Sequence, residues 1–167
     1  MATARIGIAG IGLTSPLGES LQDAWQRLLA GQGAVGRMSF DGLPDIAAAQ
    51  VTADVSAVLS RLQQVGTERV SQMALGAVRK ALADAGIEAW PDPERVGLYL
   101  GTGMGGAATL DAGFAALYGG GRIPPLTVPA GMVNGAAAVV AASSGTVTWN
   151  ASSISNISSA TVSESRL

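Results

Sequence analysis

The sequence predicts a layered α/β domain with apolar strands. Strand-like apolar segments and helical patterns follow one another in the order β-α-β-α-β-α-α-β, which is typical of layered α/β folds. Residues 96–100 are apolar on both faces, as in a strand that is covered on both sides. The chain has 167 residues, of which 48% are hydrophobic, and this suits one domain with a sizeable core.

The first third of the chain is expected to hold a strand, a helix and a second short strand. Residues 5–9 form a compact apolar run that ends in a glycine-rich turn, which indicates a strand. Ser20 can cap a helix over 21–30 that the following glycine ends. Residues 31–47 carry Gly, Pro and Asp and are expected to form a loop, and residues 50–55 a short strand. The apolar face of the helix consists of Leu21, Ala24, Trp25, Leu28 and Leu29.

The clearest helical pattern covers residues 68–85, where apolar residues recur at steps of three and four. The charged residues of this segment take the opposite face, so we expect them to face solvent. These charged residues are Arg69, Arg79, Lys80 and Asp84.

The second half of the chain is expected to continue with a strand, two helices and a last strand. The strand at 96–100 leads through a glycine-packed loop into a helix over about 107–117. Glycine and proline residues end that helix. An alanine-rich helix is expected over 128–142 and a short strand over 146–149.

The sequence changes character from Ser143 onward, because Ser and Thr become frequent and the core pattern fades. This stretch is interpreted either as a free tail or as a shortened strand-turn-helix segment. We therefore divide the chain into a domain at residues 1–150 and a Ser-rich segment at residues 151–167.

The composition excludes several classes of function. The chain has no Cys and no His, so it can form no disulfide, no Cys- or His-ligated zinc site and no Ser-His or Cys-His nucleophile of its own. The formal net charge is −2 without a basic stripe, so neither nucleic acid nor an acidic membrane surface is expected as a partner. No apolar run reaches the roughly 18 residues that span a bilayer. Signal-peptide features are lacking at the N-terminus, and a cytoplasmic location is expected.

The most informative local feature is the glycine loop, residues 101–106. Four glycines in six residues remove side chains where a buried strand should meet the next helix, so another group must approach this backbone. The loop has the form of a dinucleotide fingerprint, but it lies late in the chain, and residues 112–163 contain no Asp or Glu to bind a ribose. A structural glycine turn is therefore favoured over a nucleotide site.

Two serines, Ser152 and Ser153, follow the strand expected at 146–149. A serine at a strand-to-helix turn can be a nucleophile beside a helix N-terminus, or it can simply cap the helix. Because the chain has no His to act as a base, capping is the favoured interpretation.

Several segments together resemble the β-ketoacyl-[acyl carrier protein] synthases, which are condensing enzymes of the thiolase superfamily. The run Arg-Ile-Gly-Ile-Ala-Gly-Ile-Gly-Leu-Thr-Ser-Pro-Leu-Gly at 5–18 is similar to the family's first strand and turn, and Ala-Trp-Gln-Arg-Leu-Leu-Ala-Gly at 24–31 follows at the family's spacing. The resemblance covers residues 5 to about 150, which correspond to the N-terminal half of such an enzyme. The other matching segments are Phe40-Asp41, residues 81–86, Val96-Gly97 with the glycine loop, Val128-Pro129 and Val133-Asn134.

The resemblance implies a thiolase-like α-β-α layered half, with one βαβαβαβ-type repeat of the condensing-enzyme fold. It also implies decarboxylative Claisen condensation of acyl and malonyl thioesters in fatty acid or polyketide synthesis, without a cofactor or metal. The family's nucleophilic Cys aligns with Ser153, and two further groups are usually His residues of the C-terminal half. Since this chain lacks the Cys and both His, it is expected to be incomplete and inactive alone. Met104 resembles the position that lines the acyl pocket, with Gly103 and Gly105 beside it.

The resemblance also implies partners. Acyl carrier protein would deliver the substrate, and the apolar segment 128–142 is similar to part of the family's dimer interface, so a homodimer or a heterodimer with a ketosynthase is expected. An alternative hypothesis is a non-catalytic, chain-length-factor-like subunit that pairs with an active ketosynthase. The serine at position 153 and the short length of the chain favour that alternative.

Overall fold

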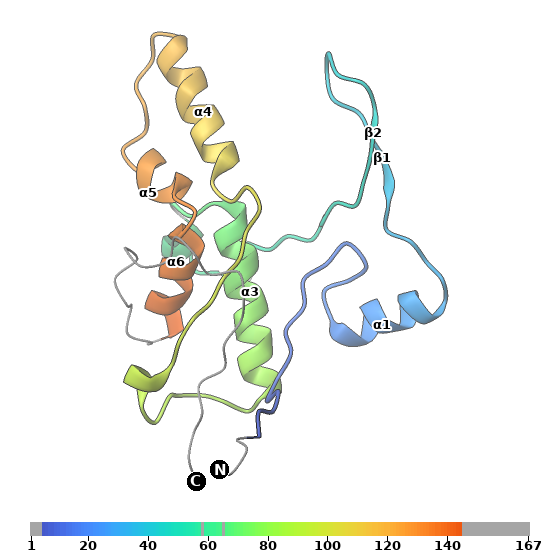
Figure 1. Cartoon of the computed structure of the whole chain (residues 1–167). Helices are drawn as coiled ribbons and strands as arrows, with labels where there is room; N and C mark the ends of the chain where they lie inside the picture. The colour runs from blue at the N-terminus through green and yellow to red at the C-terminus, as the bar shows by residue number, and fades with distance from the viewer. Residues whose placement is uncertain (1–4, 58, 65, 145–167) are drawn as a thin grey trace.

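The structure is a computed structural model that describes residues 5–57, 59–64 and 66–144. Figure 1 shows α3, α4, α5 and α6 gathered together, while α1 and the β1–β2 hairpin stand apart from them on connecting chain. The described elements are α1 (Leu21–Leu29), β1 (Gly36–Met38), β2 (Ile46–Ala48), α2 (Arg61–Gln64), α3 (Arg69–Asp84), the 3-10 helix η1 (Pro93–Arg95), α4 (Ala107–Tyr118), α5 (Thr127–Gly131) and α6 (Gly135–Ser144).

The hydrophobic core lies between α3 and α6, which pack side by side (Figure 1). Leu75 of α3 and Val140 of α6 are each only 1% exposed, and Leu59 completes the buried cluster. Leu98, from the segment that leads to the glycine loop, packs against this cluster. The core therefore fixes the chain immediately before the loop.

Helix α1 confirms the prediction of a helix at 21–30. The Ser20 hydroxyl accepts a hydrogen bond from the Asp23 amide at 3.0 Å, and Ala30 is the C-cap residue before Gly31, whose φ is 68°. Ala24 is its one buried residue, and Trp25 on the predicted apolar face is 57% exposed. The apolar face of α1 is thus largely uncovered among the described residues.

The region predicted as a loop at 31–47 contains an antiparallel hairpin, so that prediction was wrong. Strands β1 and β2 pair with Gly36 opposite Ala48 and Met38 opposite Ile46. The turn includes Gly42 at a φ of 76°, and an ion pair joins Arg37 to Asp45 across the hairpin.

No strand forms at 50–55, because a side chain takes up the backbone carbonyls there. Arg69 donates hydrogen bonds to the carbonyl oxygens of Val51 at 2.6 Å and Ala53 at 3.3 Å. These carbonyls are therefore bound by a guanidinium and not by a neighbouring strand.

Residues 5–9 and 96–100 do not form strands in the described part of the chain. Neither segment has a hydrogen-bonded strand partner there, and a strand exists only in a ladder. Ile8 is 83% exposed. In the second segment Leu98 packs on the core while Tyr99 is exposed. Only one face of this segment is therefore covered, whereas the sequence predicts that both are.

The charged face of α3 binds connecting chain, which corrects the expectation that it faces solvent. Lys80 donates to the carbonyl oxygens of Leu13 at 3.1 Å and Glu19, and Asp84 accepts a hydrogen bond from the Ile11 amide at 2.9 Å. These side chains hold the N-terminal segment across the helix.

The helix expected at 128–142 is two helices, α5 and α6. The break follows Gly131, where Met132 has an extended ψ of 136°. The helices predicted at 68–85 and about 107–117 are confirmed as α3 and α4.

Candidate functional site

The glycine loop leads directly into α4. Gly106 is the N-cap residue of this helix, is buried, and has a φ of 91°, in the left-handed region that favours glycine. A Cβ built at Gly106 would overlap the carbonyl oxygen of Gly131 at the end of α5. The group that approaches this part of the loop is therefore the protein's own backbone.

The other glycines of the loop have different surroundings. The Gly105 amide donates to the Thr102 hydroxyl at 3.0 Å, and a Cβ at Gly105 would lie 2.7 Å from that oxygen. Apart from the adjoining residues of the chain, no described atom lies within 4 Å of a Cβ built at Gly101 or Gly103. Packing in the described structure thus explains Gly105 and Gly106 and leaves the first half of the loop uncovered.

The carboxylate of Glu68 caps α4 from a distant part of the chain. Its Oε2 accepts a hydrogen bond from the Gly106 amide, and its Oε1 accepts one from the Thr109 amide at 3.1 Å. The N-terminus of a helix favours negative charge, so this is a favourable place for a carboxylate. A phosphate at these amides would have to displace a group of like charge, which disfavours a nucleotide site.

Met104 is the one large side chain of the loop, and it is 80% exposed. Its carbonyl oxygen accepts a hydrogen bond from the Ala107 amide at 3.1 Å, so the residue is tied to the first turn of α4. A methionine side chain is unbranched and adapts its shape to an apolar neighbour. The loop therefore offers an adaptable apolar side chain on a fixed backbone.

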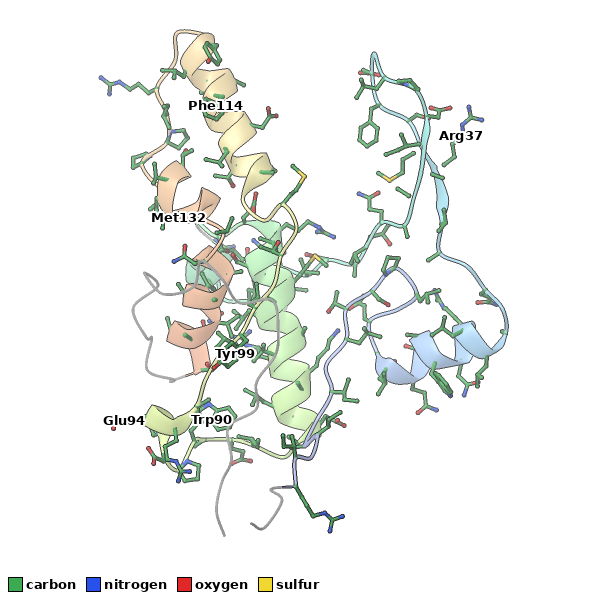
Figure 2. All side chains as sticks on the ribbon, in the orientation of Figure 1. Arg37, Trp90, Glu94, Tyr99, Phe114 and Met132 are labelled. Carbon is green, nitrogen blue, oxygen red and sulfur yellow. The ribbon has the colours of Figure 1, made fainter. Side chains whose placement is uncertain are left out.

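Exposed apolar side chains also lie on the elements after the loop, as they do on α1 and the hairpin. Figure 2 shows Phe114 on α4 and Met132 just beyond α5. The Phe114 ring stacks on Tyr118, with the ring centroids 6.4 Å apart. Neighbouring exposed apolar side chains of this kind are typical of an interaction surface. The side chains are those of Leu110, Phe114, Leu117, Tyr118, Leu126, Val128, Met132 and Val133.

The predicted nucleophile position lies outside the described residues. This applies to Ser152, Ser153, the strand expected at 146–149 and the whole segment 151–167.

In the described ranges, no group of three or more His, Cys, Asp or Glu residues is placed to hold a metal ion. The helices of that same part of the chain are all too short or too polar to cross a membrane.

A comparison with known families tests the resemblance inferred from the motifs. Residues 3–163 match the family described as "Beta-ketoacyl synthase, N-terminal domain". The chain belongs to this family. The resemblance inferred from the ordered motifs is thereby confirmed, and the glycine loop lies within the matched residues.

Curated relatives come from both fatty acid and polyketide synthesis. The chain is 33% identical over 147 residues to 3-oxoacyl-[acyl-carrier-protein] synthase 2 of Coxiella burnetii, an alignment that covers 84% of this chain and 36% of the relative. It is 34% identical over 125 residues to the tetracenomycin polyketide synthase ketoacyl synthase alpha subunit of Streptomyces glaucescens, covering 72% of this chain and 29% of the relative. The chain thus spans about a third of the length of these relatives.

A solved structure supports the fold. The chain is similar to a β-ketoacyl synthase from Burkholderia phymatum with a TM-score of 0.72 and 26% identity, over 84% of this chain and 36% of that one. The prediction of an α/β, thiolase-like fold is confirmed by this similarity. The described residues contain helices and a two-stranded sheet, consistent with a fragment of an α/β fold.

Sequence reasoning placed Met104, Gly103 and Gly105 on the loop before α4, and the structure has them there. It did not find Glu68, which lies far from the loop in sequence. One signal was present: α4 begins Gly-Ala-Ala-Thr, with neither a capping side chain at its N-cap nor an acid at its third position. Such a helix needs an acceptor from elsewhere in the chain.

Proposed function

We propose that this β-ketoacyl synthase N-terminal domain forms one wall of an acyl-chain pocket in a condensing enzyme of fatty acid or polyketide synthesis. The exposed Met104 side chain on its fixed loop is the observation that carries the proposal. Every methylene of an acyl chain buried against such a surface contributes about 0.8 kcal/mol. Met104 would therefore influence how long an acyl chain the pocket accepts.

Gly103 and Gly105 flank Met104 and leave room for the ligand. No described group outside the adjoining chain approaches a Cβ position at Gly103, so the backbone there is accessible to an acyl chain. The Gly105 amide donates a hydrogen bond to the Thr102 hydroxyl, and this bond maintains the turn between the two residues. The two glycines would thus have separate roles, one for access and the other for shape.

The reaction proposed for the assembled enzyme is a decarboxylative condensation. A malonyl thioester loses CO₂, the resulting carbanion forms a carbon–carbon bond with the acyl carbonyl, and the thiolate that held the acyl chain leaves. The 167 residues contain no Cys to carry the acyl chain and no His to promote decarboxylation. We therefore expect no condensation by this chain alone, because a serine at position 153 would be far less ionised than a thiol near neutral pH.

The partners proposed for this domain are an acyl carrier protein, which presents the acyl thioester, and a second ketosynthase chain. We place this assembly in the cytoplasm. The exposed apolar side chains of α4 and of the segment after α5 support the second partner, since Val133 is 71% exposed.

These same side chains favour an alternative function as a non-catalytic, chain-length-factor-like subunit. Such a subunit would contribute Met104 or its surface to a pocket completed by an active ketosynthase. Co-purification distinguishes the two: a stable heterodimer with a full-length synthase supports the subunit, and a monomer that only aggregates supports an incomplete condensing enzyme.

Acyl binding can be tested with methionine methyl groups as probes. The chain labelled with [methyl-¹³C]methionine is titrated with acyl pantetheine thioesters of increasing length. The methyl signal of Met104, assigned with Met104→Leu, should shift, while that of Met38 in β1 should not. An unchanged Met104 signal at every length would contradict the proposal.

A further inference from the structure

We propose that Glu68 is a positioning residue that fixes the glycine loop and, through it, the Met104 side chain. The part of this inference that concerns acyl chains rests on the proposed function. The part that concerns the loop rests on hydrogen bonds alone. Glu68 is separated from its two partners by 38 and 41 residues, so no local pattern reveals the connection.

Glu68 does not serve the helix that it precedes. It occupies the N-cap position of α3, yet its side chain makes no capping hydrogen bond there. Both carboxylate oxygens bind amides of α4, at its N-cap residue Gly106 and at its third residue Thr109. In a capping box these two amides are bound by side chains at the third position and the N-cap of the same helix. Glu68 alone replaces both of those side chains.

The reason that α4 cannot cap itself lies in Gly106. A side chain at this position would overlap the Gly131 carbonyl, and the backbone has a φ of 91°. The close approach of α5 therefore requires a residue without a capping side chain. The amides of Gly106 and Thr109 then have no hydrogen-bond acceptor within α4, and the Glu68 carboxylate provides one for each.

Glu68 is itself held in place by its neighbours. The Thr67 hydroxyl donates to the carbonyl oxygen of Gln63, at the end of α2, and lies 3.3 Å from that of Gln64. The Gln72 side-chain amide donates to the Thr67 carbonyl oxygen at 3.2 Å. The carboxylate thus projects from an anchored backbone. Its hydrogen bonds to α4 therefore fix the end of the glycine loop relative to that backbone.

Met104 lies inside the turn that the hydrogen bond from the Gly105 amide to the Thr102 hydroxyl closes. Glu68 holds the next amide along the chain, that of Gly106. Release of the Glu68 contact would free the loop at the end where Met104 joins α4. The Met104 side chain would then sample more positions and discriminate less between acyl lengths.

The test compares Glu68→Gln with Glu88→Gln, a change at an exposed glutamate beyond α3, in the full chain. Gln keeps one acceptor and turns an N–H group toward the second amide. We expect hydrogen exchange at the Gly106 and Thr109 amides to accelerate about tenfold or more in Glu68→Gln only. The Met104 methyl signal should move, and that of Met38 should not. Unchanged exchange at both amides would overturn the inference.

A second variant separates positioning from general destabilisation. Adding Thr109→Glu to Glu68→Gln places an acid at the third position of α4, from which it can reach back to the Gly106 amide. This variant should restore the slow exchange of Gly106 and the Met104 signal. If overall stability recovers but the Met104 signal does not, Glu68 has a structural role only and the inference fails.

The acyl arm of the test measures the ratio of affinities for a long and a short acyl pantetheine thioester. Glu68→Gln should change this ratio at least twofold in the same direction as Met104→Ala. If Met104→Ala changes the ratio and Glu68→Gln does not, the positioning role is contradicted while the proposed function stands. If the wild-type chain binds no thioester, the proposed function and the acyl role of Glu68 both fail, and the exchange data still decide whether Glu68 holds the loop.

Discussion

Gly12 crosses helix α3 directly over Ala77, so that a Cβ at Gly12 would overlap the Ala77 carbonyl oxygen. The contact brings the N-terminal segment against α3, where Lys80 and Asp84 bind its backbone. The crossing is a second place, besides the glycine loop, at which a glycine permits two backbones to meet.

Substituting Gly12 should loosen this crossing. We expect Gly12→Ala to destabilise the chain by about 2 kcal/mol, because the helix backbone cannot move aside without strain. Gly7→Ala is the matched control, since no described atom beyond its chain neighbours lies within 4 Å of a Cβ there. Urea unfolding measures both, and equal midpoints for the two variants would argue against the crossing.

The contact between α4 and α5 should be still more sensitive. Gly106→Ala adds a Cβ against the Gly131 carbonyl at a backbone conformation that disfavours side chains, and a loss of about 3 kcal/mol is expected. Gly101→Ala, at the uncovered start of the loop, should cost little. Thermal unfolding of the two variants tests the difference, and a stable Gly106→Ala protein would show that α5 does not pack as described.

The core prediction concerns Leu75. Leu75→Ala removes a fully buried side chain between α3 and α6 and should cost about 3 kcal/mol. Leu28→Ala, on the exposed face of α1, should change the free energy of unfolding by much less. Comparable losses for the two variants would mean that the face of α1 is covered in solution.

The cap of α1 can be tested separately. Ser20→Ala removes the acceptor of the Asp23 amide and should destabilise the helix by about 1 kcal/mol, whereas Ser20→Asp retains an acceptor. Hydrogen exchange at the Asp23 amide reports this locally. The prediction fails if that amide exchanges equally fast in both variants.

A pH-dependent prediction concerns the turn at Asp54. The Ser56 hydroxyl donates to the Asp54 carboxylate at 2.6 Å and the Ser56 amide at 3.0 Å, and these bonds hold the pKa of Asp54 below its ordinary value of 3.8. Because the folded-state pKa is lowered, the stabilisation is complete above the ordinary pKa and is lost as the pH falls through the folded-state pKa. Ser56→Ala should raise the pKa in a carboxyl NMR titration, with Ser39→Ala as the control.

The helices were largely predictable from the sequence because their signals are local. Ser20 and Gly31 mark the two ends of α1, and three- and four-residue spacing marks α3. The hairpin was missed although Asp41-Gly42 is a turn signal, because its strands of three residues carry too little pattern.

The remaining differences come from contacts between distant residues. The carbonyls of Val51 and Ala53 are bound by Arg69, and the helix expected at 128–142 breaks at Gly131, where a Cβ would meet Leu110. Likewise, the sequence identifies Met104 by resemblance and shows that α4 lacks a cap of its own, but it does not identify Glu68 as the residue that holds the loop. Such long-range partners cannot be read from spacing along the chain.

The central claim, that Met104 lines an acyl pocket, is tested most directly by the acyl-length preference of Met104→Phe. The affinities of this variant and of the wild-type chain for a series of acyl pantetheine thioesters are measured side by side, with Leu43→Phe in the exposed hairpin turn as the control. We predict that the bulkier side chain shifts the preference toward shorter acyl chains and that the control leaves it unchanged. An identical length preference in wild type and Met104→Phe would contradict the account.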